Sequence, residues 1–214
     1  MSELVSRQNF LNYLEGIDYH YFGNINADWD TINNECEKNV EEHPEYWCSL
    51  VPEESEFEAW DKNGENYIKH LQPGKEWGYH SRNTMSWETT SIKPKLEMSW
   101  EKDIVSQLPL YESVSRPTLQ RPGNIMPWHD DKFFYFKHEY PDEYDYTIRF
   151  IVFHNDWEIG HIIQAGDSYI PHWKQGDVIT WFPRRWHLAA NIGMLDKWTT
   201  NITGVLREEV NSVI

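Results

Sequence analysis

The sequence predicts a mainly β protein, a sandwich or jelly roll with helices packed on its outside. Two observations lead to this fold class. From residue 110 onward, short β-rich runs alternate with Pro, Gly and Asp turns, and many short strands at such spacing are typical of sandwiches and jelly rolls. Residues 1–108 are polar and acidic, and their apolar side chains recur at helical spacing.

The length of 214 residues predicts one domain over residues 1–214. Within it we expect a helical or irregular N-terminal part, residues 1–109, that packs on a β core formed by residues 110–207. The 12 Trp, 12 Tyr and 9 Phe supply the apolar surface that this core needs. Disordered acidic chains are poor in such residues, so the acidity does not indicate disorder.

Apolar spacing and breakers predict the elements in order. Helices are expected over Leu4–Ile17, Asp30–Glu42, Phe57–Leu71 (before Pro73-Gly74) and Glu101–Leu108 (before Pro109). Strands are expected over Tyr111–Leu119, Tyr146–Phe153, His161–Gln164, Ser168–Trp173, Asp177–Phe182 and Trp198–Leu206. Turns are expected at Pro122-Gly123, Ala165-Gly166-Asp167, Gln175-Gly176-Asp177 and Asn191-Ile192-Gly193.

Composition excludes several classes of protein. No run of 18 apolar residues is present, so no membrane span is expected. The first residues lack the apolar stretch of a signal peptide, which predicts a cytoplasmic protein with Cys36 and Cys48 as free thiols. Two cysteines make neither a disulfide framework nor a zinc-thiolate site. The net charge of −16 argues against a nucleic-acid backbone as the main partner, but not against a local basic pocket.

The string His129-Asp130-Asp131 is the strongest chemical signal. In a His-x-Asp pair the imidazole and the carboxylate lie on one side of an extended chain. A distant His187 would complete a set of two His and one carboxylate, which leaves three positions of an octahedral metal open, as in non-heme Fe(II) oxygenases. A second pair, His154-Asn155-Asp156, follows an apolar strand, where a His is usually packed or caps the strand. The spacing favours Asp131 as the ligand, although Asp130 stays an alternative.

The segments that follow His129 come in a characteristic order. They are Asn155-Asp156-Trp157, Gly160-His161, Gly176-Asp177-Val178, His187, Asn191 and Lys197-Trp198-Thr199. This order resembles the double-stranded β-helix core of the Fe(II)/2-oxoglutarate-dependent oxygenases over about residues 111–207. It looks closest to the prolyl-hydroxylase and aspartyl/asparaginyl β-hydroxylase branches, and is similar to uncharacterised oxygenase-like proteins of marine phages.

The resemblance implies a role for particular residues. His129, Asp131 and His187 would bind Fe(II), and Lys197 would pair with the distal carboxylate of the co-substrate 2-oxoglutarate, helped by the Thr118 hydroxyl. Arg149, in an otherwise apolar strand, needs an anion. It would contact the metal-binding end of 2-oxoglutarate or a carboxylate of the substrate.

The same resemblance implies the reaction. With O2, the protein would hydroxylate an amino-acid or peptide side chain or a small metabolite and release succinate and CO2. A carboxylate in the ligand set argues against a halogenase.

Structural alternatives stay open for these residues. Lys197 would be a solvated lysine beside Asp196, Arg149 would pair with Asp145, and Thr118 would be an ordinary strand residue. Arg184 and Arg185 would lie in a solvated turn or grip an anionic substrate. Two other functions also fit the sequence: a cupin-like binding module with a vestigial metal site, and a non-oxidative enzyme that uses another divalent metal.

Overall fold

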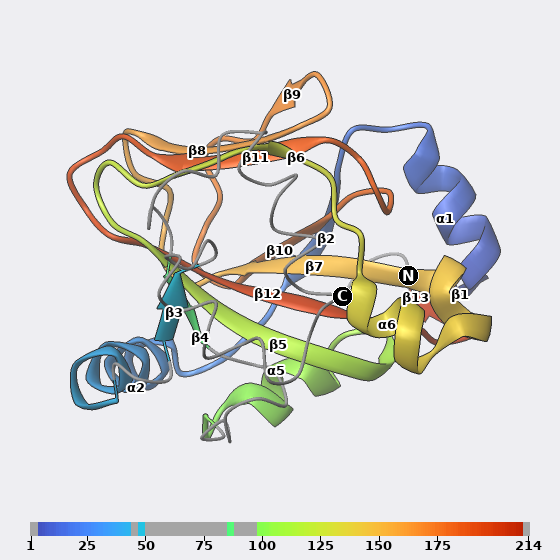
Figure 1. The fold of residues 1–214 in the computed structure, drawn as a ribbon, viewed down its shortest axis with the longest axis horizontal. Helices are drawn as coiled ribbons and strands as arrows, with labels where there is room; N and C mark the ends of the chain where they lie inside the picture. The colour runs from blue at the N-terminus through green and yellow to red at the C-terminus, as the bar shows by residue number, and fades with distance from the viewer. Residues whose placement is uncertain (1–3, 44–46, 50–84, 88–97, 212–214) are drawn as a thin grey trace, which may run out of the picture.

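A computed structural model of the chain describes residues 4–43, 47–49, 85–87 and 98–211. Its described part is built around two antiparallel sheets, which lie as an upper and a lower layer in Figure 1. This arrangement confirms the mainly β fold class with a jelly-roll, double-stranded β-helix core. None of its described helices is long and apolar enough to cross a membrane.

The larger sheet contains, in spatial order, β2 (His20–Asn24), β10 (Asp177–Thr180), β7 (Thr147–Phe153), β12 (Lys197–Leu206), β5 (Leu110–Gln120), β4 (Met85–Trp87) and β3 (Trp47–Ser49). The smaller sheet contains β6 (Ile125–His129), β11 (His187–Asn191), β8 (His161–Ala165) and β9 (Ser168–Tyr169). A separate pair joins β1 (Leu4–Ser6) to β13 (Glu209–Asn211). The helices are α1 (Arg7–Glu15), α2 (Trp29–Glu42), α5 (Glu101–Ser106) and α6 (Phe134–Glu139), with a 3-10 segment η2 (Pro141–Tyr146).

The N-terminal helices begin at side-chain caps. Ser6 Oγ accepts a hydrogen bond from the Asn9 amide at the start of α1, and Asp28 Oδ1 accepts one from the Thr31 amide at the start of α2. Each helix then buries an apolar stripe, which is Phe10, Leu11 and Leu14 in α1 and Trp29, Ile32 and Cys36 in α2. The helices predicted at 4–17, 30–42 and 101–108 correspond to α1, α2 and α5, although residues 4–6 form β1 and not helix. The helix predicted at 57–71 lies outside the described residues.

The large sheet separates two apolar clusters. Alternate residues of its central strand β7 point to opposite faces: Phe150 and Val152 join the cluster under the helices, while Ile151 and Phe153 join the cluster between the two sheets. The second cluster also contains Trp173 and residues of the smaller sheet. The space between the sheets is therefore walled by apolar and aromatic side chains.

Several elements differ from the sequence prediction. Strands β2, β6 and β11 were not expected, because their sequences HYFGN, IMPWH and HLAAN lack a run of β-branched residues. Pro127 is tolerated in β6 because this strand lies at the edge of its sheet. The predicted strand 168–173 shortens to Ser168–Tyr169, since Pro171 cannot donate to the ladder and His172 has a φ of 60°.

Candidate metal centre

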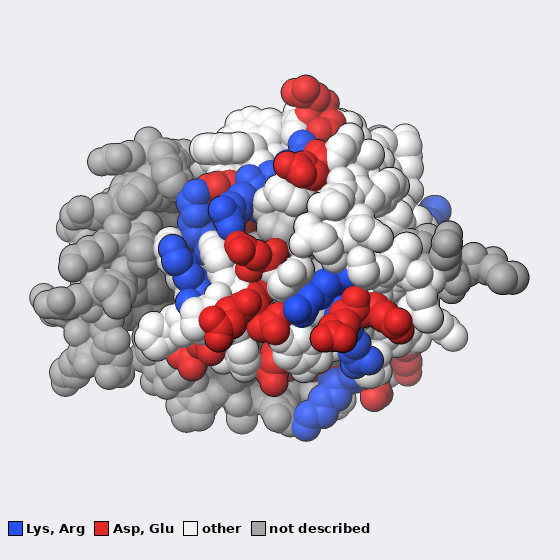
Figure 2. Space-filling model, turned by 90° about the vertical axis from the view of Figure 1, so that its right-hand side faces the viewer, with Lys and Arg blue, Asp and Glu red and all other residues white. Residues whose placement is uncertain are grey.

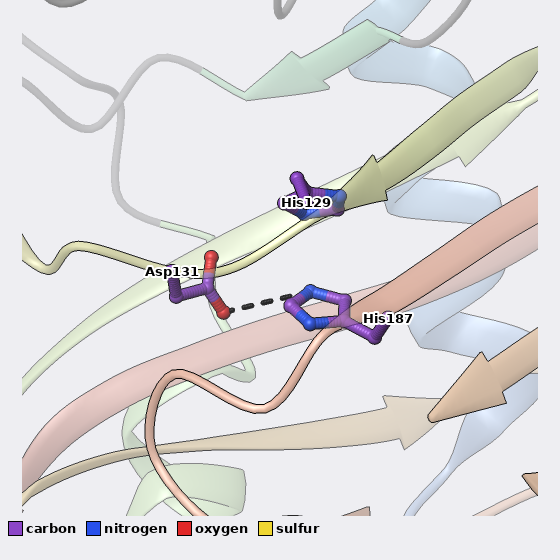
Figure 3. A group of neighbouring side chains, drawn as sticks. All are labelled: His129, Asp131 and His187. Atoms are coloured by element: carbon purple, nitrogen blue, oxygen red, sulfur yellow. Dashed lines mark ion pairs between the residues drawn. The ribbon is translucent and has the colours of Figure 1, made fainter. Parts of the chain in front are cut away.

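Two neighbouring strands of the smaller sheet bring the candidate ligands together. His129 is the last residue of β6 and His187 the first of β11, and the two are paired across the ladder. Asp131 follows two residues after β6 ends, in the loop that leads to α6. Figure 3 shows the Asp131 and His187 side chains directed toward one another, with His129 beside them. Antiparallel pairing thus joins residues that are 58 positions apart in the sequence.

The three side chains form a compact group of metal-ligand type. One ligand atom from each of His129, Asp131 and His187 lies within 4.8 Å of the others. Within the described ranges, this is the one group of three such residues that meets that spacing. His187 Nε2 lies 3.7 Å from Asp131 Oδ2, and the two imidazole centroids are 4.1 Å apart. An ion placed between these atoms would be held by two nitrogens and one oxygen.

Hydrogen bonds fix which atom each ligand offers. The Nδ1–H groups of His129 and His187 donate to the carbonyl oxygens of Pro127 and Arg185, both at 2.8 Å. A carbonyl can only accept, so each Nε2 keeps its lone pair. Asp131 Oδ1 accepts from Arg149 at 2.6 Å, and Asp131 Oδ2 is buried with no hydrogen-bond partner in the described structure. A buried oxygen without a donor is costly, so this free oxygen beside two lone-pair nitrogens fits a divalent cation.

The electrostatics hold the group in its ligand form. Burial, reinforced by the neighbouring His187, lowers the pKa of His129 to about 4, and burial also lowers the pKa of His187. Burial opposes ionisation of Asp131, but Arg149 and the two imidazoles outweigh it and hold the pKa of this carboxyl below its usual value. At neutral pH the site therefore holds two neutral imidazoles and one carboxylate, which is the state that binds a metal without first losing protons.

Lys197 lies between the same two sheets. Its side chain is 1% exposed, and Nζ donates to Gln120 Oε1 and the Ile162 carbonyl, each at 2.8 Å. Burial lowers the pKa of Lys197 to about 7. The alternative of a solvated lysine beside Asp196 is therefore wrong. The hydrogen bonds described for Nζ all go to uncharged oxygens, so a carboxylate would be a favourable further partner.

Strand register places Thr118 and Arg149 on the inner face of the large sheet. Thr118 is opposite Thr199, two residues along β12 from Lys197, and its hydroxyl accepts from Asn201 Nδ2 at 3.0 Å. Arg149 is opposite Thr203 on the same face of β12. The sequence left open whether these side chains point inward. The register shows that they do.

Arg149 and Arg185 form ion pairs other than those considered from the sequence. Asp145 pairs with Arg184 at 3.6 Å, and Arg149 pairs with Asp131. Arg185 lies 3.4 Å from Asp18 and donates to the Glu15 carbonyl at 2.8 Å, so it fastens the loop before β2 to the start of β11. Arg185 is thus held by Asp18 and the Glu15 carbonyl, and its side chain is only partly exposed.

Three further residues clarify the site. Asp130 pairs with Lys132, which leaves Asp131 as the carboxylate of the group. His154 is fully buried against Trp29 and Trp100 on the other side of the sheet, so the second His-x-Asp string forms no such group. Sequence reasoning missed Gln120, which holds the Lys197 ammonium. Its position two residues after Thr118 on the same strand face was the available signal.

The surface near α1 and α6 is mixed in charge. Figure 2 shows this side of the molecule, where Lys and Arg side chains lie among Asp and Glu side chains. Lys132, Lys137 and Arg184 belong to α6 and the loops near Asp131, and the last two lie over the Tyr144 ring. The net charge of −16 is therefore not expressed as a uniformly acidic surface here, and it does not exclude an anionic ligand.

The fold and the three-residue group define a double-stranded β-helix protein with a candidate metal centre. No protein-family model matches the chain, and no curated protein matches it. Among solved structures it is similar to a prolyl-4-hydroxylase from Pseudomonas putida, with a TM-score of 0.53 and 10% identity over 94% of this chain and 99% of that one.

Two other solved structures match with lower TM-scores. One is the non-heme α-ketoglutarate-dependent carbocyclase SnoK of nogalamycin biosynthesis, with a TM-score of 0.48 and 12% identity over 98% of this chain and 90% of that one. The other is an uncharacterised protein with a double-stranded β-helix domain from Klebsiella pneumoniae, with a TM-score of 0.32 and 17% identity over 47% of this chain and 74% of that one. At 10% identity, the likeness to the prolyl-4-hydroxylase establishes the fold alone.

Proposed function

We propose that the protein is an Fe(II)- and 2-oxoglutarate-dependent oxygenase, with His129, Asp131 and His187 as the metal ligands. The observation that carries this proposal is the triad, in which one ligand atom of each residue lies within 4.8 Å of the others and Asp131 Oδ2 has no hydrogen-bond partner among the described residues. Two imidazoles and one carboxylate leave positions open for a chelating co-substrate and O2. When bound, Fe(II) with 2-oxoglutarate and O2 supplies the oxidising chemistry, and succinate and CO2 are released.

Lys197 supports 2-oxoglutarate as the co-substrate. Its ammonium also lies 3.4 Å from the carbonyl of Ala190, which is three residues beyond His187 on β11. At a rise of roughly 3.3 Å per residue, cation and triad are about 10 Å apart along the strand. A five-carbon oxo-diacid bound to the metal at one end would direct its other carboxylate toward Lys197. We assign Thr118 to the same carboxylate, because it lies on β5, the strand that pairs with β12, and faces the same side of the sheet as Lys197.

The other residues around the site orient the metal ligands and exclude water. Trp181 packs against the His187 ring, with centroids 4.6 Å apart, and Phe153 stacks on Trp173 at 4.2 Å on the inner face. These aromatic walls keep the dielectric low around the ligands and hold His187 in place. We propose hydroxylation of an amino-acid or peptide side chain, or of a small metabolite, as the reaction.

Anaerobic titration with Fe(II) and 2-oxoglutarate tests the function. Wild type should develop the visible charge-transfer band of a chelated keto acid, and should form succinate once air is admitted. His129→Ala should give neither. His138→Ala is the matched control, because this histidine is exposed on α6 and pairs with Glu139.

The other outcomes separate the alternative functions. Metal binding without a band or succinate would favour a non-oxidative metal-dependent enzyme. Absence of metal binding by wild type would favour a cupin-like binding module and reject the proposed function.

A further inference from the structure

Arg149 is the one charged residue of the buried strand β7, and it is held by three neighbouring elements. Its Nη1 donates to Asp131 Oδ1 at 2.6 Å, and its Nε donates to Thr203 Oγ1 on β12 at 2.9 Å. The backbone carbonyl of Arg149 accepts from Thr180 Oγ1 on β10 at 2.7 Å. A guanidinium fixed at two of its nitrogens has little rotational freedom, so the atom that it offers to Asp131 is fixed in space.

Asp131 needs such a partner because no strand holds it. It lies in the loop after β6, whereas both imidazoles stand on paired strands and are fixed by their own Nδ1 hydrogen bonds. With Oδ1 bound to Arg149, the carboxylate plane is set and Oδ2 is left facing His187 Nε2 at 3.7 Å. The Asp131 side chain is 10% exposed, so water contributes little to its orientation.

We propose that Arg149, itself oriented by Thr203, is a positioning residue that makes Asp131 bind the metal through Oδ2 alone. This inference rests on the proposed metal site and deepens it. A carboxylate free to rotate could chelate with both oxygens and occupy a position that the co-substrate or O2 requires. Partners of this kind commonly change metal affinity 10- to 100-fold. The role differs from the sequence expectation that Arg149 contacts the co-substrate or a carboxylate of the substrate.

Variants that keep a positive charge at residue 149 separate the positioning of Asp131 from the electrostatic effect of that charge. Arg149→Lys retains the cation but lacks the fork that reaches Asp131 and Thr203 together. Thr203→Val keeps the shape and removes the acceptor for Nε, while Thr203→Ser restores it. Thr200→Val is the matched control: Thr200 is a buried residue of the same strand on its opposite face, where its hydroxyl lies 2.6 Å from His154 Nε2.

The measurement is titration of metal-free protein with Co(II), followed by its visible d–d bands, without any co-substrate. Arg149→Lys and Thr203→Val should bind Co(II) at least about tenfold more weakly, with altered d–d bands. Thr203→Ser and Thr200→Val should match wild type in affinity and bands, even where Thr200→Val lowers the melting temperature. Because Thr203→Val leaves Arg149 in place, it tests the idea even if Arg149→Lys does not fold.

Two results would overturn the inference in different ways. If wild type and both test variants bind Co(II) equally with unchanged bands, Arg149 does not position the ligand. A weaker affinity for 2-oxoglutarate in those Co(II)-loaded variants would then assign it to the co-substrate. If wild type itself does not bind Co(II), the metal site and the proposed function fail together with the inference.

Discussion

The buried ammonium of Lys197 should make the stability of the ligand-free protein rise with pH. Burial lowers its pKa from 10.5 to about 7 in the folded state. Between pH 7 and 10.5 the unfolded chain therefore binds one more proton at this residue than the folded chain, and raising the pH favours folding. Each pH unit in this window contributes about 1.4 kcal/mol. From pH 6 to pH 9 the contribution of Lys197 is about 2.7 kcal/mol.

The assay compares wild type with Lys197→Met by guanidinium denaturation at pH 6, 7, 8 and 9. Methionine leaves the acceptors Gln120 Oε1 and Ile162 O without their donor, which costs the variant a constant amount at every pH. The free energy of unfolding of wild type minus that of Lys197→Met should therefore stay flat up to pH 7 and then rise. Other titrating groups cancel in this difference. A difference that does not change with pH would refute the burial of a low-pKa ammonium at this position.

Three further predictions concern stability. Burial lowers the pKa of His154 to about 3, so wild type should lose about 1.4 kcal/mol per pH unit relative to His154→Gln as the pH falls from 6.5 toward 3. Parallel acid-denaturation curves would contradict this. Gly160→Ala should lower the melting temperature more than Gly123→Ala, although both glycines have a positive φ. A Cβ at Gly160 would lie 2.3 Å from the Gly193 amide, whereas a Cβ at Gly123 would have no described non-neighbouring atom within 4 Å. Equal losses would refute the steric argument. Leu14→Ala should reduce the unfolding free energy in urea by about 2–5 kcal/mol, since Leu14 is 0% exposed, and a loss below about 1 kcal/mol would show that the cavity collapses.

The strands that the sequence could predict are those buried over most of their length. β7 and β12 read as dense apolar or β-branched runs because both of their faces are covered. β6 and β11 escaped prediction because only four of their ten residues are buried, because they lack a run of β-branched residues, and because β6 contains Pro127. The sequence nevertheless proposed His129 and His187 as candidate ligands, since the motif depends on residue types and order and not on recognising the strands.

The contacts between site residues that are far apart in the chain could not be predicted from the sequence. The pair formed by Arg149 and Asp131 depends on how the loop after β6 returns across the large sheet, and no local pattern encodes that path. Sequence proximity suggested, as alternatives, acids that the structure does not pair with these residues: Asp145 for Arg149 and Asp196 for Lys197. The inward direction of Thr118 required the strand register, because a shift by one residue would turn it to the opposite face.

Two groups of the candidate site are unfavourable in a ligand-free protein. One is the Lys197 ammonium, whose described hydrogen bonds go only to neutral oxygens. The other is Asp131 Oδ2, which has no hydrogen-bond donor in the part of the chain that the structure describes. Folds built for stability alone rarely keep such groups, since apolar residues of similar volume are often equally or more stable. Their charges are opposite, which matches a cation at Asp131 and an anion at Lys197. Because both lie between the same two sheets, a metal and an oxo-diacid bridging them would compensate both costs together. The unfavourable burial of these two groups is therefore better explained by one shared binding site than by two unrelated structural features.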